Sequence, residues 1–390
     1  MPSHHGVCRS RELSPLLAPE YYDTVERACV AYRAQHSGTR LGGTHMDRPV
    51  GFAVIGTGLV GPTHARFITE AKGAQLRVVC DLREDRGRPL ALEHDAAWLT
   101  DYREVMKRDD VDVVTICLPT ALHLEVATAA AEAGKHVLVE KPIELNIERA
   151  QALVEVCKRN GVKLGAIFNR RFVFGTRRTH DAVHGGELGR MLVADMRFKA
   201  WRSPEYYSES GWRGTWDKEG GAALINQGIH GVDLMTWIAG PIVRVQGYAR
   251  HLLHDIEGDD TTIAVVEYAS GALGTIQCTT SLHPKQPDRL EFHGTQGTIL
   301  LEEYNISAWQ LDNGSEPGAP SAEERALPGA DRGTSAGHFF QVQDMADAVR
   351  EGRDPVIRGE DVLHSLAVVK AIYEAERTGA AVDVPQPAEL

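Results

Sequence analysis

Short apolar runs alternate with amphipathic stretches between Pro49 and about Leu138. The apolar runs are Phe52 to Ile55, Leu76 to Cys80, Val113 to Ile116 and His136 to Val139. Such runs are typical of strands buried on both faces, and each interval is long enough for a crossover helix. The pattern predicts an α/β domain with a doubly wound parallel sheet, which we place at residues 49–168.

The pattern changes after the helical stretch Ile147 to Asn160. Strand-like segments now follow one another without intervening helices, at Leu164 to Phe168, Leu192 to Lys199, Ile242 to Tyr248, Thr261 to Tyr268, Ala272 to Thr279 and Thr298 to Leu301. They predict an α+β domain at residues 169–390 with a large, mostly antiparallel sheet. Helical patterns near 221–237, 339–350 and 361–377 would cover one face of this sheet, and 312–337 reads as a long surface loop.

Residues 1–48 are expected to be an N-terminal extension, because residues 1–45 are polar, punctuated by Pro and Gly, and hold one weakly helical patch at 19–35. The composition of the whole chain is that of a globular protein, and its net charge of −12 argues against nucleic-acid binding. No run approaches the roughly 18 apolar residues of a membrane span. Six scattered cysteines without a CxxC pair fit a reducing compartment, so we expect a cytoplasmic protein.

A glycine motif, Gly56-Thr57-Gly58-Leu59-Val60-Gly61, directly follows the first apolar run and precedes a helical stretch, His64 to Ala71. This setting is the one in which GxGxxG binds a dinucleotide. Gly56 permits the tight turn, Gly58 lets the backbone approach a pyrophosphate, and Gly61 allows close helix packing. The alternative is a structural turn without a ligand.

Asp81 ends the second apolar run twenty positions after Gly61, where a carboxylate can accept hydrogen bonds from ribose hydroxyls. It would repel a 2′-phosphate, which favours NAD over NADP, although Arg83, Arg86 and Arg88 follow closely. The alternative is that Asp81 is a loop carboxylate or a helix cap. The other residues that we assign to the cofactor site are Leu118, Pro119, Thr120, His123, Glu140 and Lys141.

Lys141 is the leading candidate for proton transfer, because it stands just past the run His136 to Val139, at the edge where open α/β sheets bind ligands. Oxidising an alcohol requires a base beside the nicotinamide. Asn226 and His230, at i and i+4 of a predicted helix after Gly220-Gly221, would share one helix face and address one hydroxyl. The alternative for Lys141 is an ion pair with Glu140 at the end of the strand. The alternative for His230 is a histidine buried in the core.

The chain resembles the glucose-fructose oxidoreductase, inositol dehydrogenase and rhizopine catabolism (Gfo/Idh/MocA) family. The resemblance lies in GTGLVG at 56–61, EKP at 140–142 and GGAALINQGIHGVDL at 220–234. It implies a Rossmann domain and a mostly antiparallel second domain, with Lys141 as catalytic lysine and His230 as catalytic or substrate-polarising histidine. Many inositol-dehydrogenase-like members carry Asp where this chain has Asn226, so Lys141 should carry more of the proton transfer and His230 should orient the alcohol.

The expected substrate is a sugar, glycoside or cyclitol. Within the family, the asparagine at position 226 resembles the sugar dehydrogenase subgroup. The expected contacts of the substrate are Asn169, Arg170 and Arg171, which follow a strand, and the rings of Trp201, Trp212 and Trp216. The rings could stack on a sugar, or equally anchor the core or a subunit contact. We expect no metal site, since the cluster of His251, His254, Asp255 and Glu257 lies in a polar loop.

The leading hypothesis is therefore an NAD-dependent dehydrogenase acting on a ring hydroxyl. A redox-neutral enzyme of the same fold, a glycosidase or epimerase, is the first alternative, and a non-enzymatic sensor of sugars or nucleotides is the second. The resemblance also implies a homodimer or homotetramer formed through the open face of the second sheet.

Overall fold

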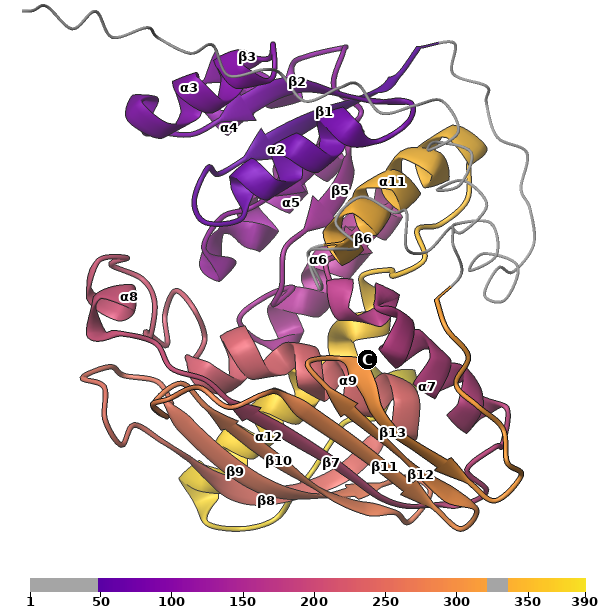
Figure 1. The fold of residues 1–390 in the computed structure, drawn as a ribbon. Coiled ribbons are helices and arrows are strands. Elements are labelled where there is room, and N and C mark those ends of the chain that lie inside the picture. Colours follow the sequence, from indigo (N-terminus) through magenta and orange to yellow (C-terminus); the bar gives the residue numbers. More distant parts are fainter. Residues whose placement is uncertain (1–47, 321–335) are drawn as a thin grey trace, which may run out of the picture.

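The computed structural model describes residues 48–320 and 336–390. Figure 1 shows two domains, one built on a six-stranded sheet and one on an eight-stranded sheet. The expectations for residues 1–45, including the helical patch at 19–35, and for the second half of the loop 312–337 lie outside the described residues.

The first sheet has the strand order β3-β2-β1-β4-β5-β6, and all its pairs are parallel. This confirms the doubly wound sheet, whose order reverses between β1 and β4, where ligands bind beyond the carboxyl ends of the strands. Its strands are β1 (Val50–Ile55), β2 (Ala74–Cys80), β3 (Ala97–Leu99), β4 (Val113–Ile116), β5 (His136–Val139) and β6 (Leu164–Ala166).

The prediction that 164–168 belongs to the antiparallel sheet was wrong. The segment β6 pairs in parallel with β5 after the crossover helix α6 (Ile147–Arg159). All five residues of 164–168 are buried, and a short run of this kind carries no signal for the direction of its partner.

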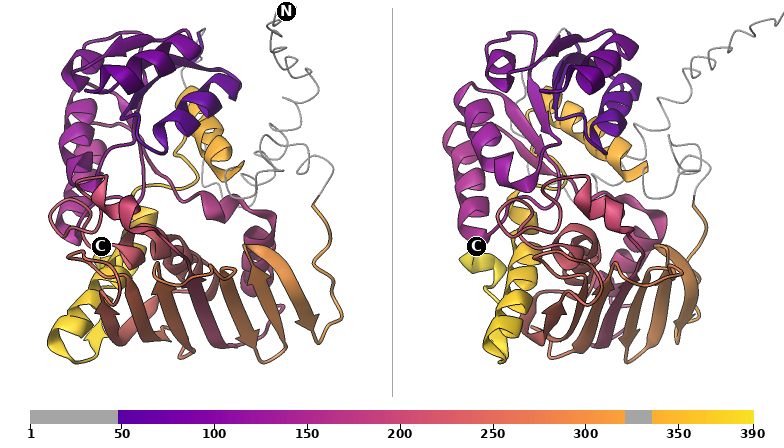
Figure 2. Two further views of the ribbon diagram at one scale, coloured as in Figure 1. Left: turned by 60° about the vertical axis from the view of Figure 1, so that its left-hand side comes forward. Right: turned by 90° about the vertical axis from the view of Figure 1, so that its left-hand side faces the viewer.

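The helices of the first domain include one from the far end of the chain. The sequential ones are α2 (Gly61–Glu70), α3 (Glu84–Glu93), α4 (Tyr102–Met106), η1 (Thr120–Leu122), α5 (His123–Glu132) and α6. Helix α11 (Ala336–Glu351) lies beside α2 in Figures 1 and 2, and its Phe339 and Met345 share a core with Phe52 of β1. The prediction that 339–350 covers the antiparallel sheet was therefore wrong, because an apolar helix face does not specify which sheet it meets.

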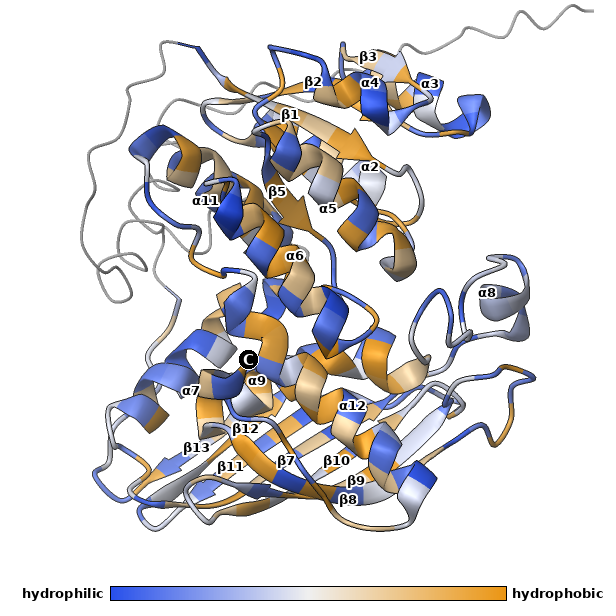
Figure 3. Cartoon of the chain, turned by 180° about the vertical axis from the view of Figure 1, so that it is seen from behind, coloured by the Kyte–Doolittle hydropathy of each residue, from blue (hydrophilic) through white to orange (hydrophobic). Residues whose placement is uncertain are grey.

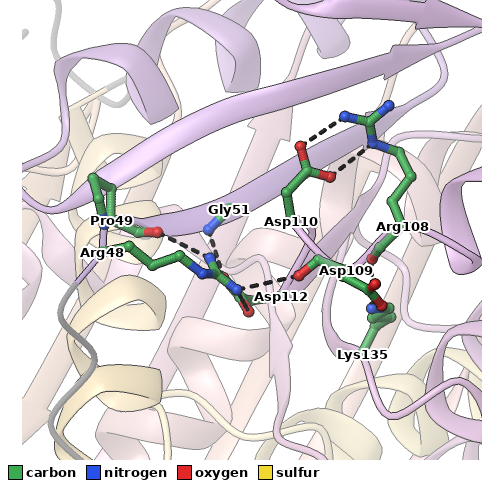
Figure 4. Close-up of polar contacts among 8 residues, drawn as sticks. All are labelled: Arg48, Pro49, Gly51, Arg108, Asp109, Asp110, Asp112 and Lys135. Atoms are coloured by element: carbon green, nitrogen blue, oxygen red, sulfur yellow. Dashed lines mark hydrogen bonds and ion pairs between the residues drawn. The ribbon is translucent and has the colours of Figure 1, made fainter.

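The amino-terminal edge of the first sheet is fixed by Asp112, just before β4 (Figure 4). Both of its carboxylate oxygens accept hydrogen bonds from Arg48, at 2.7 and 2.8 Å, and Oδ2 also accepts from the backbone N–H of Gly51 at 2.7 Å. These contacts hold the start of β1 against β4, so that Ile55 and Ile116 pair where the two strands end.

The second sheet has the order β13-β12-β11-β7-β10-β9-β8-β14. Only β7 and β10 pair in parallel, which confirms the mostly antiparallel expectation. Its strands are β7 (Met191–Lys199), β8 (Ile242–Arg250), β9 (Thr261–Tyr268), β10 (Leu273–Thr279), β11 (Arg289–Gly294), β12 (Gly297–Glu302), β13 (Asn305–Leu311) and β14 (Val382–Asp383). Exposed and buried residues alternate along β9, and Figure 3 shows hydrophilic and hydrophobic segments alternating across this sheet.

Helices cover the face of the second sheet that is turned toward the first domain (Figures 1 and 2). They and the remaining short helices are η2 (Asn169–Phe172), α7 (Phe174–His184), α8 (Pro204–Ser208), η3 (Ala223–Gly228), α9 (Ile229–Ala239), η5 (Glu360–Val362), α12 (Leu363–Thr378) and η6 (Pro387–Glu389). Coverage by 221–237 and 361–377 is confirmed, but η3 is a π-helical turn where a regular helix was predicted. Within the described ranges, no helix has both the length and the apolar composition to cross a bilayer.

A buried ion pair joins η2, the segment between the domains, to α9. The guanidinium of Arg171 donates to both oxygens of Asp233 at 2.8 and 2.6 Å, and Ser365 of α12 donates to the same carboxylate at 3.1 Å. Both charged side chains are buried, so each depends on the other for compensation.

We predict that Asp233→Asn lowers the free energy of unfolding by about 3–5 kcal/mol, because it removes the negative charge that compensates the buried guanidinium of Arg171. Urea denaturation of the purified protein measures the change. Glu374→Gln, which removes one partner of the exposed pair with Arg377, is the control and should leave the unfolding curve unchanged. Equal unfolding curves for Asp233→Asn and the wild type would refute the structural role of the pair.

Candidate active site

The glycine loop connects β1 to α2, as predicted. Gly56 has φ +97°, and a Cβ there would lie 2.5 Å from the carbonyl oxygen of Cys117, whereas a Cβ on Gly61 would lie 2.2 Å from the oxygen of Gly56. Both glycines are therefore required by the folding of the loop itself. At Gly58 a Cβ would meet no protein atom within 4 Å, so packing inside the protein does not explain this glycine.

The start of α2 fits an anionic group. Its N-cap position is Val60, which offers no side-chain acceptor, and its first turn contains no acidic residue. Pro62 has no N–H and the N–H of Thr63 donates to the oxygen of Val60 at 3.0 Å, so the N–H of Gly61 and the positive end of the helix dipole are what the first turn offers to a bound anion. Together with the open surface at Gly58, this arrangement fits the pyrophosphate of a dinucleotide.

Asp81 lies just beyond β2 and contacts the glycine loop. Its Oδ2 accepts hydrogen bonds from the backbone N–H and the hydroxyl of Thr57, at 2.7 and 2.6 Å. Of the three arginines that follow, Arg83 is paired with Asp85 and Arg88 with Glu84, both in exposed ion pairs, and Arg86 lies in the first turn of α3. The carboxylate is thus the charge that faces the loop, which suits NAD better than a cofactor with a 2′-phosphate.

The residues that follow β4 lie at the same edge of the sheet. Leu118 and Pro119 lead into η1, where Thr120 is buried. The two ring nitrogens of His123 contact the carbonyl oxygens of Leu118 and Ile143, at 3.0 and 3.2 Å, so this histidine holds the two loops together. A direct role of these four residues and of the exposed Leu59 toward the cofactor stays a prediction.

Glu140, directly after β5, is the centre of a buried polar cluster. Its Oε1 contacts Nε2 of His64 in α2 at 2.8 Å and Nε2 of His338 in α11 at 3.4 Å, and the three side chains bring their polar atoms within 4.8 Å of one another. Nδ1 of His338 in turn accepts from Nδ2 of Asn169 at 3.1 Å. The cluster joins α2, α11 and the segment between the domains at the end of β5.

The protonation of this cluster follows from its contacts. Burial opposes the charge on His64, but the contacts with Cys117 and Glu140 outweigh it and raise the pKa of His64 to about 10. Burial likewise opposes the charge on Glu140, yet His338 and His64 hold the pKa of this carboxyl well below its usual range. The directions of the two pKa shifts favour a buried ion pair between His64 and Glu140, whose Nε2 and Oε1 are 2.8 Å apart.

Lys141 is held next to this cluster, and its backbone N–H donates to Oε2 of Glu140 at 3.1 Å. Its Nζ donates to the backbone oxygen and to Oδ1 of Asn226, at 2.8 and 2.9 Å. Burial lowers the pKa of Lys141 against the opposing charges of Glu140 and Glu219, and the nearby guanidinium groups of Arg170 and Arg202 lower it further. The structure thus brings together Lys141 and Asn226, as the sequence predicted.

Asn226 lies in the π-helical turn η3, whose shape is fixed by a buried carboxylate. Asp259 accepts from the backbone N–H groups of Ala222 and Leu224, at 3.0 and 2.9 Å, and from the hydroxyl of Tyr373 at 2.7 Å. Gly221 has φ +140°, and a Cβ there would lie 2.5 Å from the Tyr373 hydroxyl. Sequence periodicity could not reveal this turn, because distant residues impose it.

His230 lies in the first turn of α9, one turn after Asn226. Burial, and then the charges of Lys141 and Arg170, hold the pKa of His230 well below its usual range. Its Nδ1 is buried and makes no hydrogen bond to the described residues. His230 is therefore neutral at physiological pH, with one ring nitrogen uncommitted by the protein.

The predicted substrate contacts divide into two groups. Arg170 lies near Lys141 and His230, with its guanidinium 4.5 Å from the ring centre of Tyr304, and Asn169 binds His338. Arg171, in contrast, is engaged by Asp233 within the core.

The three tryptophans predicted to contact the substrate pack against different side chains of the protein. Trp201 packs against His254 and His283, and Trp212 against Arg213. Trp216 meets the edge of Tyr373. The direct contact of any of these rings with a substrate stays a prediction.

Several residues near Lys141 were missed by the sequence reasoning. Glu219 is buried and accepts a hydrogen bond from Nδ2 of Asn226, and its position just before Gly220-Gly221 was the available signal. Gln227 donates to Oδ1 of Asn226 at 3.2 Å and accepts from Arg202 at 2.7 Å. His338 reaches the site from a distant helix, and no local pattern pointed to it.

Two family models match the chain. Residues 50–168 match "Oxidoreductase family, NAD-binding Rossmann fold", and residues 176–300 match the "GFO/IDH/MocA C-terminal domain". Together the two ranges cover more than half of the chain.

Characterised relatives and solved structures resemble the chain over most of its length. It is 27% identical to scyllo-inositol 2-dehydrogenase (NAD(+)) of Bacillus subtilis, over 86% of this chain and 96% of that protein. It is 29% identical to myo-inositol 2-dehydrogenase of Thermotoga maritima, over 79% and 90%. The WlbA dehydrogenase of Bordetella pertussis, solved with NADH and UDP-GlcNAcA, superimposes with a TM-score of 0.80 at 26% identity and covers 88% of this chain and 100% of its own.

The His64–Glu140 ion pair makes stability depend on pH. The pKa of His64 is raised from 6.5 to about 10 in the folded protein, so its contribution is complete below about pH 6.5 and is lost as the pH rises toward 10. We predict that the stability difference between wild type and His64→Gln shrinks over this interval by up to about 1.4 kcal/mol per pH unit. Urea denaturation at several pH values measures it.

His123→Gln supplies the matched control. Burial lowers the pKa of His123, so the wild type should lose stability relative to this variant as the pH falls through about 6.5, the opposite trend. A difference for His64→Gln that stays constant from pH 6.5 to pH 10 would show that His64 is not charged in the folded protein.

Proposed function

Because the chain belongs to the Gfo/Idh/MocA oxidoreductase family, with an NAD-binding Rossmann domain, we propose that it transfers a hydride between NAD and a ring hydroxyl of a sugar, glycoside or cyclitol. In this proposal Lys141 moves the hydroxyl proton and His230 orients the alcohol. The observation that carries it is the Nζ of Lys141, held by two oxygens of Asn226 at the carboxyl edge of the first sheet.

The two contacts of Nζ support the proposed role of Lys141 as a base. A neutral amine has two N–H groups and one lone pair, and both N–H groups are used by the oxygens of Asn226. The lone pair is then left to accept a proton from a substrate hydroxyl. The lowered pKa of Lys141 favours this neutral form and so favours its use as a base near neutral pH.

His230 suits a positioning role better than that of a proton acceptor. Its pKa is held well below the usual range, so the imidazole stays neutral while a proton moves. A neutral imidazole can hydrogen-bond to the alcohol oxygen without competing for its proton. Bound NAD supplies the hydride acceptor, and the residues described here orient the alcohol and remove its proton.

The groups around Lys141 and the relatives support the proposed substrate class. Arg202, Gln227 and Tyr206 form a hydrogen-bonded row next to Asn226, a surface suited to a molecule with several hydroxyl groups. The relatives named above act on inositols, and the solved WlbA dehydrogenase binds a nucleotide-linked sugar. A polyhydroxylated ring is common to these molecules.

We also propose that two copies of the chain associate through the open face of the second sheet. This face has no helix over it in Figures 1 and 2, and it exposes Tyr248, Ile263, Val265 and Leu273 on three adjacent strands. Ile263 and Val265 are more than half exposed, whereas their neighbours Ala264 and Val266 are buried under the helices. An apolar patch of this kind is typical of a subunit interface.

We predict that Lys141→Ala lowers kcat for hydride transfer by roughly 10²- to 10⁴-fold, because it removes the proton acceptor. Binding of NADH should persist, since the glycine loop and Asp81 are unchanged. NADH absorbance with a panel of sugars and cyclitols measures the rate, and a fluorescence titration measures NADH binding. In the wild type, kcat/KM for oxidation should rise with pH until Lys141 is neutral.

Lys163→Ala, which removes a half-buried lysine before β6, is the control and should retain activity. Full activity of Lys141→Ala on a substrate of the wild type would refute its role. Retained NAD together with product and no net NADH would instead identify a redox-neutral reaction.

We predict that Val265→Asp converts the assembled protein to monomers, because it places a charge in the middle of the proposed interface. Light scattering coupled to size-exclusion chromatography measures the mass. Leu92→Asp, which introduces the same charge at a still more exposed leucine of α3, should leave the mass unchanged. A monomeric wild type, or an assembled Val265→Asp protein, would refute the interface.

A further inference from the structure

Glu219 is a buried carboxylate that the proposed reaction does not yet use. It directly precedes Gly220-Gly221 and is 1% exposed. Its Oε2 accepts a hydrogen bond from the backbone N–H of Gly214, and its Oε1 accepts one from Nδ2 of Asn226. None of the ion pairs among the described residues includes it, so its hydrogen bonds are its direct compensation, and the charges of Lys141 and Arg213 act from further away.

The contact with Glu219 decides which way the amide of Asn226 points. An amide has a donor end and an acceptor end, and an ionised carboxylate only accepts. As long as Glu219 is ionised, Nδ2 therefore faces it, which turns Oδ1 toward Nζ of Lys141 and Nε2 of Gln227. With the amide reversed, Nδ2 would donate to the lone pair of Lys141 and block it.

Charge adds to this geometric effect. Glu140, Glu219, Arg170 and Arg202 are the charged groups that act on Lys141, and Glu140 is shared with His64 and His338. Lys141 and Arg213 are the cations that act on Glu219. Burial raises the pKa of Glu219 to about 7, against the hydrogen bonds from Gly214 and Asn226. Its negative charge opposes the lowering of the lysine pKa.

Resting on the proton-transfer role of Lys141, we propose that Glu219 is a positioning residue of the same site. It acts through Asn226, whose amide it orients so that the lone pair of Lys141 stays free. Glu219 also supplies a negative charge, with Asn226 lying between it and Lys141. An aspartate at position 226 would place this charge in direct contact with the lysine.

The variant Glu219→Gln tests both effects at once. The N–H of Gly214 requires an acceptor, so it selects the oxygen of the new side chain and turns the new amide nitrogen toward Asn226. Asn226 must then present Oδ1 to this nitrogen and Nδ2 to Lys141. The lost charge and the reversed amide both favour the neutral lysine, so the protonation midpoint of Lys141 should fall.

The double variant Glu219→Gln/Asn226→Asp should reverse the change. The carboxylate introduced at position 226 accepts from the amide nitrogen at position 219 and from Lys141 together, so every hydrogen bond finds a partner and a negative charge lies directly on the lysine. The midpoint of Lys141 should then rise above that of the wild type. Asn226→Asp alone places two carboxylates against each other and should be the less stable of the two Asn226 variants.

The measurement needs no substrate. Lys141 in the full chain is labelled with acetic anhydride across a pH series, and peptide mass spectrometry gives the pH of half-maximal labelling rate, with Lys163 as internal control. We expect this midpoint to fall in Glu219→Gln and to rise in the double variant, while that of Lys163 stays constant. Where a substrate is known, kcat should fall roughly 10- to 100-fold in Glu219→Gln and recover in the double variant at a pH above its raised Lys141 midpoint, where the lysine is neutral.

An unchanged Lys141 midpoint in folded Glu219→Gln would overturn the proposal and leave the role of Lys141 intact. A midpoint that falls in both variants would overturn the proposal in the same way. Full activity of Lys141→Ala, in contrast, would overturn the proposed function itself, so the two failures are distinguishable.

Discussion

The buried carboxylate of Glu140 constrains most of the site. A charge in the interior requires a partner and hydrogen bonds, and Glu140 obtains them from α2 through His64, from α11 through His338, and from the backbone of Lys141. The helix that begins at the glycine loop and the lysine proposed to move protons are thus fixed to one another by a single side chain. A change in the position of α2 would be transmitted to Lys141 without passing through the sheet.

A second buried carboxylate, Asp259, plays the corresponding part in the other domain. It fixes the turn η3 through two backbone N–H groups and the Tyr373 hydroxyl, and η3 presents Asn226 to Lys141. The amine is therefore held between two rigid supports, one from each domain. Such support is what keeps a catalytic group in productive geometry when a substrate arrives.

The sequence predicted those parts of the molecule that depend on local patterns. Strands buried on both faces, the glycine loop, and the places of Asp81 and Lys141 at strand ends all follow from runs and spacings within one domain. The placement of α11, the direction of β6, the π-helical turn and the contacts of Glu140 and Glu219 depend on partners far along the chain. An amphipathic face states that a helix must be covered, but the identity of the covering element is a property of the whole fold.

The pairing of an amide with a more distant carboxylate has a consequence for proton transfer. A carboxylate in direct contact stabilises an ammonium strongly, which favours the form of lysine that cannot act as a base. Asn226 offers two oxygens without a charge, so it holds the amine in place while adding little preference for protonation. The charge of Glu219 acts over a longer path, and its pKa of about 7 lets it lose that charge as protons accumulate. Lys141 and Glu219 then titrate as a coupled pair, and the protonation of the base depends on both groups.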